Sequence, residues 1–177
     1  LGFTEANGAF LSEGFRATRS GSPNAFAVSL PSQANEAASL SPGGISSLQF
    51  KLVTVGARPA RGELHEGRLL YPEVLQSTDA IVVGDATSVE TFYLLRSTDA
   101  PRAFTYRLTL PSAVTAVESK ADGLWFYDRN HAFVMHTPPP YALDANGARV
   151  STTMSWSDAD SAITIALRDE AKAVYPI

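Results

Sequence analysis

The sequence predicts an all-β protein, an antiparallel, jelly-roll-like β-sandwich with little or no helix. Apolar residues alternate with polar ones in many short runs, as in strands that bury one face. Turn residues such as Asn-Gly and Asp-Gly separate these runs at intervals of roughly 8–12 residues, a spacing typical of sandwiches. No run sustains the 3.6-residue period of an amphipathic helix.

Residues 1–12 are interpreted as a leader or linker, followed by a single sandwich domain over residues 13–177. The turn pair Asn7-Gly8 leaves a hairpin as the alternative for the first segment. Residues 15–19 are a short strand candidate. Further strands are expected at 26–30, 48–52 and 78–83, each bounded by Gly, Pro or Asp-containing turns. Residues 64–71 are expected to form two short strands joined by a tight turn at Glu66-Gly67.

The longest alternating region, residues 87–110, predicts two central strands joined by a turn at 97–101. Phe104, Tyr106 and Leu108 share one face of the second strand. The first strand is apolar on both faces, as expected of a strand covered on two sides.

Three hairpin turns are expected after residue 110, and strands are expected at 150–156 and 163–167. The turns contain Asp122-Gly123, Arg129-Asn130 and Asn146-Gly147. In the last, Asp144 is predicted to accept hydrogen bonds from turn N–H groups, while Asn146 and Gly147 take positive φ. Tyr141, which follows three prolines, is expected to return to the core.

Composition narrows the class of partner. A net charge of −4 without a basic cluster argues against nucleic-acid binding. The absence of cysteine excludes disulfides and thiolate metal sites, and no apolar run is long enough to cross a bilayer. The chain begins without Met, and we expect it to be an internal piece of a longer polypeptide.

Two groups of side chains are candidate metal ligands, the three histidines His65, His131 and His136 for zinc and two aspartates for calcium. His131 and His136 lie five residues apart, so on one strand they would face opposite sides of a sheet and could not share a zinc ion. Asp158 and Asp160 are weak calcium candidates, because no Gly or trailing Glu completes a binding loop. Capping of a hairpin turn accounts for the same two residues.

Asp79 stands in an otherwise apolar run and is predicted to be a buried polar residue bonded to a backbone turn or to Arg96. No Gly-x-Ser-x-Gly elbow or phosphate-binding glycine loop is present. We therefore expect no enzyme activity and no cofactor.

Three aromatic residues, Trp125, Tyr127 and Trp156, admit two interpretations. They are either core residues or a platform on which a sugar ring stacks. The solvent exposure of these three side chains distinguishes the two interpretations.

Several phrases resemble the β domain that precedes the repeats in bacterial proteins of the RHS/YD-repeat type and in related secreted, cell-surface proteins. The resembling segments are Leu70-Tyr71-Pro72, Thr78-Asp79-Ala80, Val89 to Leu94, Ala100-Pro101, Phe104 to Leu108, Pro140 to Gly147 and Tyr175-Pro176-Ile177. The resemblance implies a non-catalytic structural or interaction module at the cell surface or outside the cell. Its partners would be other domains of the same polypeptide or another protein. The alternative is a carbohydrate-binding module that uses surface aromatics, with a structural calcium ion in one version.

Overall fold

The structure, a computed structural model, describes residues 2–12, 26–85, 87–168 and 172–177. Strands dominate, and a short 3₁₀ turn is present at Ser46–Leu48. The all-β prediction is confirmed. The strands are β1 (Phe3–Ala6), β2 (Ala9–Ser12), β3 (Phe26–Pro31), β4 (Ala38–Pro42), β5 (Phe50–Thr54), β6 (Glu63–His65), β7 (Arg68–Leu75), β8 (Thr78–Gly84), β9 (Val89–Leu95), β10 (Ala103–Thr109), β11 (Val114–Lys120), β12 (Gly123–Asp128), β13 (Phe133–Thr137), β14 (Ala142–Leu143), β15 (Arg149–Ser157) and β16 (Ala162–Arg168).

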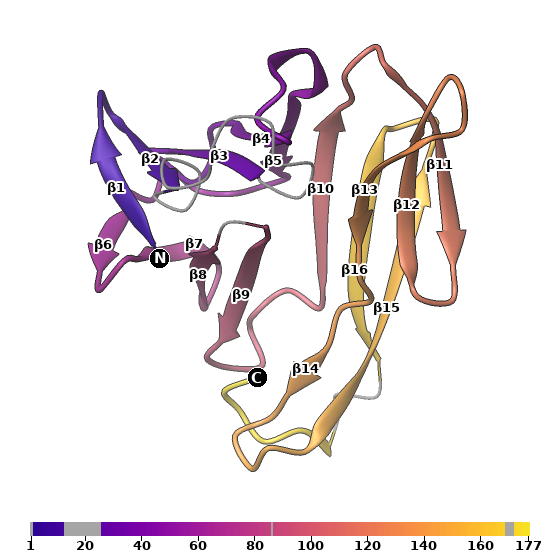
Figure 1. Cartoon of the computed structure of the whole chain (residues 1–177). Helices are drawn as coiled ribbons and strands as arrows, with labels where there is room; N and C mark the ends of the chain where they lie inside the picture. The colour runs from indigo at the N-terminus through magenta and orange to yellow at the C-terminus, as the bar shows by residue number, and fades with distance from the viewer. Residues whose placement is uncertain (1, 13–25, 86, 169–171) are drawn as a thin grey trace.

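The strands form three antiparallel sheets (Figure 1). The largest has nine strands in the order β1-β2-β3-β4-β5-β10-β16-β15-β14. A four-stranded sheet has the order β6-β7-β8-β9, and a three-stranded sheet the order β11-β12-β13.

Each small sheet covers a different part of the large one. One core joins Phe3 and Phe10 of the large sheet to Leu69 of the four-stranded sheet. A second core joins Phe50 of the large sheet to Phe126 of the three-stranded sheet. The architecture is therefore one long sheet faced by two short ones.

A third core cluster lies beside the C-terminal residue. It contains Leu95, Phe104, Leu167 and Ile177. Ile177 exchanges two backbone hydrogen bonds with Leu95, at 2.8 and 3.0 Å. This pair anchors the end of the chain to the last residue of β9.

The segment interpreted as a leader is part of the large sheet. Asn7 and Gly8, with φ of 53° and 75°, form the tight turn between β1 and β2. Phe3 and Phe10 are only 2% and 3% exposed, so burial of these two rings fixes the hairpin. Residues 3–12 therefore form a hairpin, the alternative interpretation of this segment. The strand expected at 15–19 lies outside the described residues.

Of the two strands predicted to be central, only β10 is. It lies between β5 and β16 in the nine-stranded sheet, whereas β9 is the last strand of its sheet. Four of the seven β9 residues are exposed, including Phe92 and Leu94 on its outer face. An apolar second face on β9 therefore marks an uncovered surface.

Candidate functional site

Aromatic side chains gather on the outer face of the three-stranded sheet. Leu124 and Phe126 are fully buried against the large sheet. Because strand residues alternate in direction, Trp125 and Tyr127 point to the opposite side. Rings from β13 and from the turn before it join them. We call this group the aromatic face: Trp125, Tyr127, His131, Phe133 and His136.

The rings of the aromatic face form a continuous row. The Trp125 and Tyr127 ring centroids lie 6.4 Å apart with planes 16° from parallel, and His131 stacks on Tyr127 at 4.3 Å. Phe133 stands at 62° to the Trp125 plane, with centroids 5.3 Å apart. Tyr127 is 7% exposed and Phe133 is 58% exposed. Both ends of the row are therefore accessible: His131, whose side chain is 65% exposed, and Phe133, which forms a corner with Trp125.

Two hydrogen bonds to Asp122, in the β11–β12 turn, fix the orientation of this corner. Trp125 Nε1 donates to Asp122 Oδ1 at 2.9 Å. His136 Nε2, from the adjacent strand, donates to the Asp122 carbonyl oxygen at 2.8 Å, and its ring centroid lies 4.7 Å from that of Trp125. The indole is thus held before any ligand arrives, which lowers the ordering cost of binding.

Charged side chains of β11 border the rings. Lys120 Nζ lies 5.0 Å and 4.9 Å from the Trp125 and Tyr127 centroids, within cation–π range. It donates to the Tyr127 hydroxyl at 2.5 Å and pairs with Glu118 Oε2 at 3.1 Å. The hydrogen bond to Tyr127, and then that to Glu118, raise the pKa of Lys120. Glu118 Oε1 also lies 3.6 Å from His131 Nε2.

The expectation that His131 and His136 face opposite sides of a sheet is wrong. His131 lies in the turn before β13 with φ of 59°, outside the alternation of a strand. Asp128 Oδ1 holds this turn by accepting from the N–H groups of Asn130 and Ala132, each at 2.8 Å. The two histidines contact different rings. In the described part of the chain, no group of three or more His, Cys, Asp or Glu residues could hold a metal ion.

Trp156 does not belong to the aromatic face. Its ring packs edge-on against the buried Phe126 ring, with centroids 6.1 Å apart. Its Nε1 donates to Asp158 Oδ1 at 2.6 Å. Of the three candidate aromatics, Trp125 and Tyr127 come together, and Trp156 is partly buried against the core on the other side of the sheet.

The two calcium candidates make local hydrogen bonds in the β15–β16 turn. Asp158 accepts from the Trp156 indole, and Asp160 Oδ2 accepts from the Ser157 hydroxyl at 2.8 Å. Ser157 Oγ in turn lies 3.3 Å from the backbone N of Asp160. These bonds describe a capped hairpin turn.

Asp144 organises the turn between β14 and β15. Its Oδ1 accepts from the N–H groups of Asn146 and Ala148, each at 2.9 Å, and its Oδ2 accepts from Val174 N at 3.1 Å. Gly147 takes positive φ, at 77°, and Asn146 does not. The Asp144 carboxylate thus joins the turn to the C-terminal segment.

We expect the stability of the protein to fall in acid, in part through Asp144. The N–H groups of Val174 and then Ala148 stabilise the carboxylate and lower its pKa in the folded state. A lowered folded pKa stabilises the fold above the unfolded pKa, and this contribution is lost as the pH falls through the folded pKa. Urea midpoints of the wild type and Asp144→Asn should therefore differ at pH 7 and converge towards about pH 2. A constant difference across this range would contradict the assignment.

Asp79 forms part of a polar cluster at the bulge between β7 and β8, where the register shifts between Tyr71 and Leu75. Its side chain is 15% exposed, and its Oδ1 accepts from the N–H of Glu73 at 2.8 Å. Burial raises the pKa of Asp79. Arg96 lies 3.5 Å from Asp79 Oδ1 and also pairs with Glu73. Both partners expected from the sequence are present, and the cluster stabilises a bulge.

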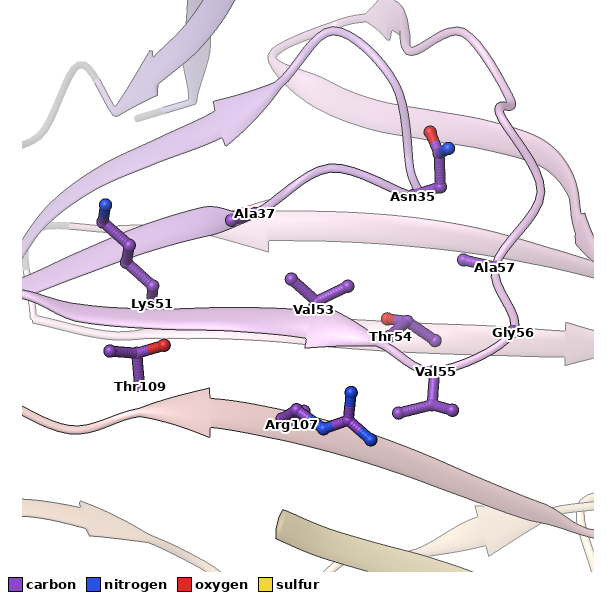
Figure 2. A pocket seen from close by; sticks show the side chains of 10 residues that line it. All are labelled: Asn35, Ala37, Lys51, Val53, Thr54, Val55, Gly56, Ala57, Arg107 and Thr109. Atoms are coloured by element: carbon purple, nitrogen blue, oxygen red, sulfur yellow. The ribbon is translucent and has the colours of Figure 1, made fainter. Parts of the chain in front are cut away.

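A shallow depression of about 480 Å³ lies over β5 and β10, on a different part of the large sheet. Lys51 and Arg107 are its two cations. Figure 2 shows them near different ends of the depression and pointing away from each other. They do not converge on one ligand position, so the aromatic face remains the better site.

Comparisons with family models, curated proteins and solved structures found no match. In the described residues, no helix is long and apolar enough to cross a membrane.

Proposed function

We propose that this chain is a non-catalytic module that binds carbohydrate on its aromatic face. The observation that carries the proposal is the corner formed by Trp125 and Phe133, whose planes meet at 62°. One side of a pyranose ring presents mainly C–H groups, which pack well on an aromatic face. Phe133, 58% exposed, then contacts the edge of the same ring.

Polar groups around this corner suit the hydroxyls of a sugar. Glu118 presents carboxylate oxygens, and Lys120 presents an ammonium group over the Trp125 ring. Hydrogen bonds to charged groups are stronger than those between neutral partners, so these two side chains supply direction as well as affinity.

The same geometry favours binding over hydrolysis. Glycosidases place two carboxyl groups on opposite sides of the scissile bond. At the aromatic face, Asp122 is engaged with the Trp125 indole, which leaves Glu118 as the acid beside the rings.

The setting that we propose is a secreted or cell-surface protein of several domains. The sequence resemblance to domains that precede bacterial surface repeats supports this setting. A structural or protein-interaction role is the second candidate, and the open edge of β9 favours it.

Tryptophan fluorescence tests the carbohydrate proposal, because the chain contains only two Trp residues. In a Trp156→Phe variant, Trp125 is the sole Trp reporter. We expect oligosaccharides that are positive on a glycan array to change its emission on titration. Trp125→Ala should weaken binding at least about tenfold, as expected for a central aromatic contact, while Trp156→Phe retains wild-type affinity.

Phe133→Ala provides a second variant with little risk to the fold, since its ring is exposed. It should also weaken binding. An array without positives, or affinities that neither Trp125→Ala nor Phe133→Ala changes, would exclude this function.

A further inference from the structure

We propose that the free edge of β9 docks an extended peptide segment of a partner protein, which adds antiparallel to β9 as the fifth strand of its sheet. Peptides bind exposed sheet edges in this way through main-chain hydrogen bonds. The proposal concerns a different sheet from the aromatic face and does not rest on carbohydrate binding.

The backbone of β9 presents unpaired groups along this edge. Leu95 directs its N–H and C=O away from β8, because both bond to Ile177. Alternate residues of a strand point the same way, so Thr91 and Tyr93 also direct their N–H and C=O outwards. Within the described residues, no backbone group bonds to these two on that side. The bonds between Leu95 and Ile177 show that the edge accepts an antiparallel partner.

The other sheet edges are protected. At the edges of the large sheet, β1 has four residues and is bonded through Phe3 N to Gly67 O, and β14 has two residues. At the far edge of the four-stranded sheet, β6 has three residues. The pairings of β11 and β13 with β12 each contain a register shift.

By contrast, β9 pairs with β8 over seven consecutive residues without a shift, and it contains neither Pro nor Lys. Short strands, bulges, Pro and Lys are the usual means of preventing edge pairing. Of the edges described, β9 alone has none of them.

Side chains beside the edge determine which residue types a bound peptide needs. Phe92 and Leu94 lie on the outer face, 37% and 39% exposed. Tyr141, 52% exposed rather than in the core as expected, packs edge-on against Phe92 at 6.4 Å. Its hydroxyl donates to Glu90 Oε1 at 3.2 Å.

An antiparallel peptide places residues k, k+2 and k+4 opposite Leu94, Phe92 and Glu90, all on this outer face. The matching sequence is apolar at k and k+2 and Lys or Arg at k+4. Positions k+1 and k+3 donate N–H groups to Tyr93 and Thr91, so proline is excluded there.

A second copy of the chain fits this edge less well. Antiparallel pairing of two β9 strands through their outward groups places Glu90 opposite Glu90, Phe92 or Leu94 of the copy in the central registers. None of these residues is a cation, and like charges directly opposite are destabilising. A peptide with a cation at k+4 removes this mismatch.

The probe is the peptide Val-Thr-Ile-Thr-Lys-Thr-Ser, with Val as position k and a fluorophore at its C-terminal end. It begins at k because Ile177 already occupies the position opposite Leu95. Anisotropy titration should show saturable binding. The same peptide N-methylated at the first and second Thr, positions k+1 and k+3, loses both main-chain donors but keeps its side chains, and should bind at least about tenfold more weakly. Replacing its Lys by Glu should also weaken binding.

Two substitutions at one position provide the protein controls. Thr91→Pro removes the outward N–H without breaking a bond to β8, and should weaken binding at least about tenfold. Thr91→Val keeps the N–H and should bind within about twofold of wild type. The N-methylated peptide tests the same bonds on unaltered protein, so the result does not depend on how Thr91→Pro folds.

Three outcomes would overturn the proposal. They are no saturable binding of the probe, equal affinity for the methylated and unmethylated peptides, and a dimer in sedimentation equilibrium that Thr91→Pro abolishes. The last would assign the edge to a second copy of the chain.

Discussion

Phe3→Ala is expected to lower the free energy of unfolding by about 3–5 kcal/mol, the usual cost of removing a buried phenylalanine ring. Phe3 is 2% exposed and belongs to the core between β1–β3 and the four-stranded sheet. Its ring lies against Gly84, where an added Cβ would stand 2.9 Å from Cζ. Gly84 has no side chain that could move into the cavity that the alanine leaves.

The matched control is Phe133→Ala, which removes an identical side chain that is 58% exposed. Its cost should stay below about 1 kcal/mol. Urea denaturation of both variants gives the comparison. A Phe3→Ala midpoint equal to that of wild type would mean that residues 1–12 are a leader after all.

Alternation of apolar residues predicts strands well and their sheet membership poorly. β10 and β9 have similar apolar content, yet β10 lies inside the large sheet and β9 at an edge. A period of two reports which residues share a face, but it cannot report whether another layer covers that face. The exposed Phe92 therefore could not be distinguished from a core residue.

Turn chemistry explains which turns were recognised. Glu66-Gly67 forms the tight β6–β7 turn expected of it, with φ of 49° and 78°. The strand β4 was missed because Ala38, Ser39 and Ser41 have weak strand propensity and little apolar contrast. It is held instead by long-range pairing with β3 and β5.

The candidate site was predictable in part. Trp125 and Tyr127 share a face because they lie two residues apart on one strand. His131 joins them through a positive-φ turn, and Lys120 through the neighbouring strand. The positions of His131 and Lys120 depend on turn geometry and on strand register, and the local sequence determines neither. Trp156 could not be assigned to a side of the core without knowing which sheet contains β15.

Gly123→Ala is expected to destabilise the protein by about 3–4 kcal/mol or more, through steric conflict with backbone atoms. Gly123, at the start of β12, has φ of 131°. A Cβ built there would lie 2.1 Å from the Thr137 carbonyl oxygen and 2.9 Å from His136 Nε2. Relief requires β13 to move away from β12, which strains the ladder between Leu124 and Thr137 and displaces the imidazole beside Trp125.

Gly147→Ala separates this steric conflict from the cost of positive φ alone. Gly147 also has positive φ, at 77°, but nothing lies within 4 Å of a Cβ built on it. Its replacement should cost about 1 kcal/mol, since only conformational strain is added. Urea denaturation of the two variants should thus show a several-fold difference in cost. Near-equal costs would show that β12 and β13 do not approach each other at Gly123 as described, and the support for Trp125 from His136 would fail with it.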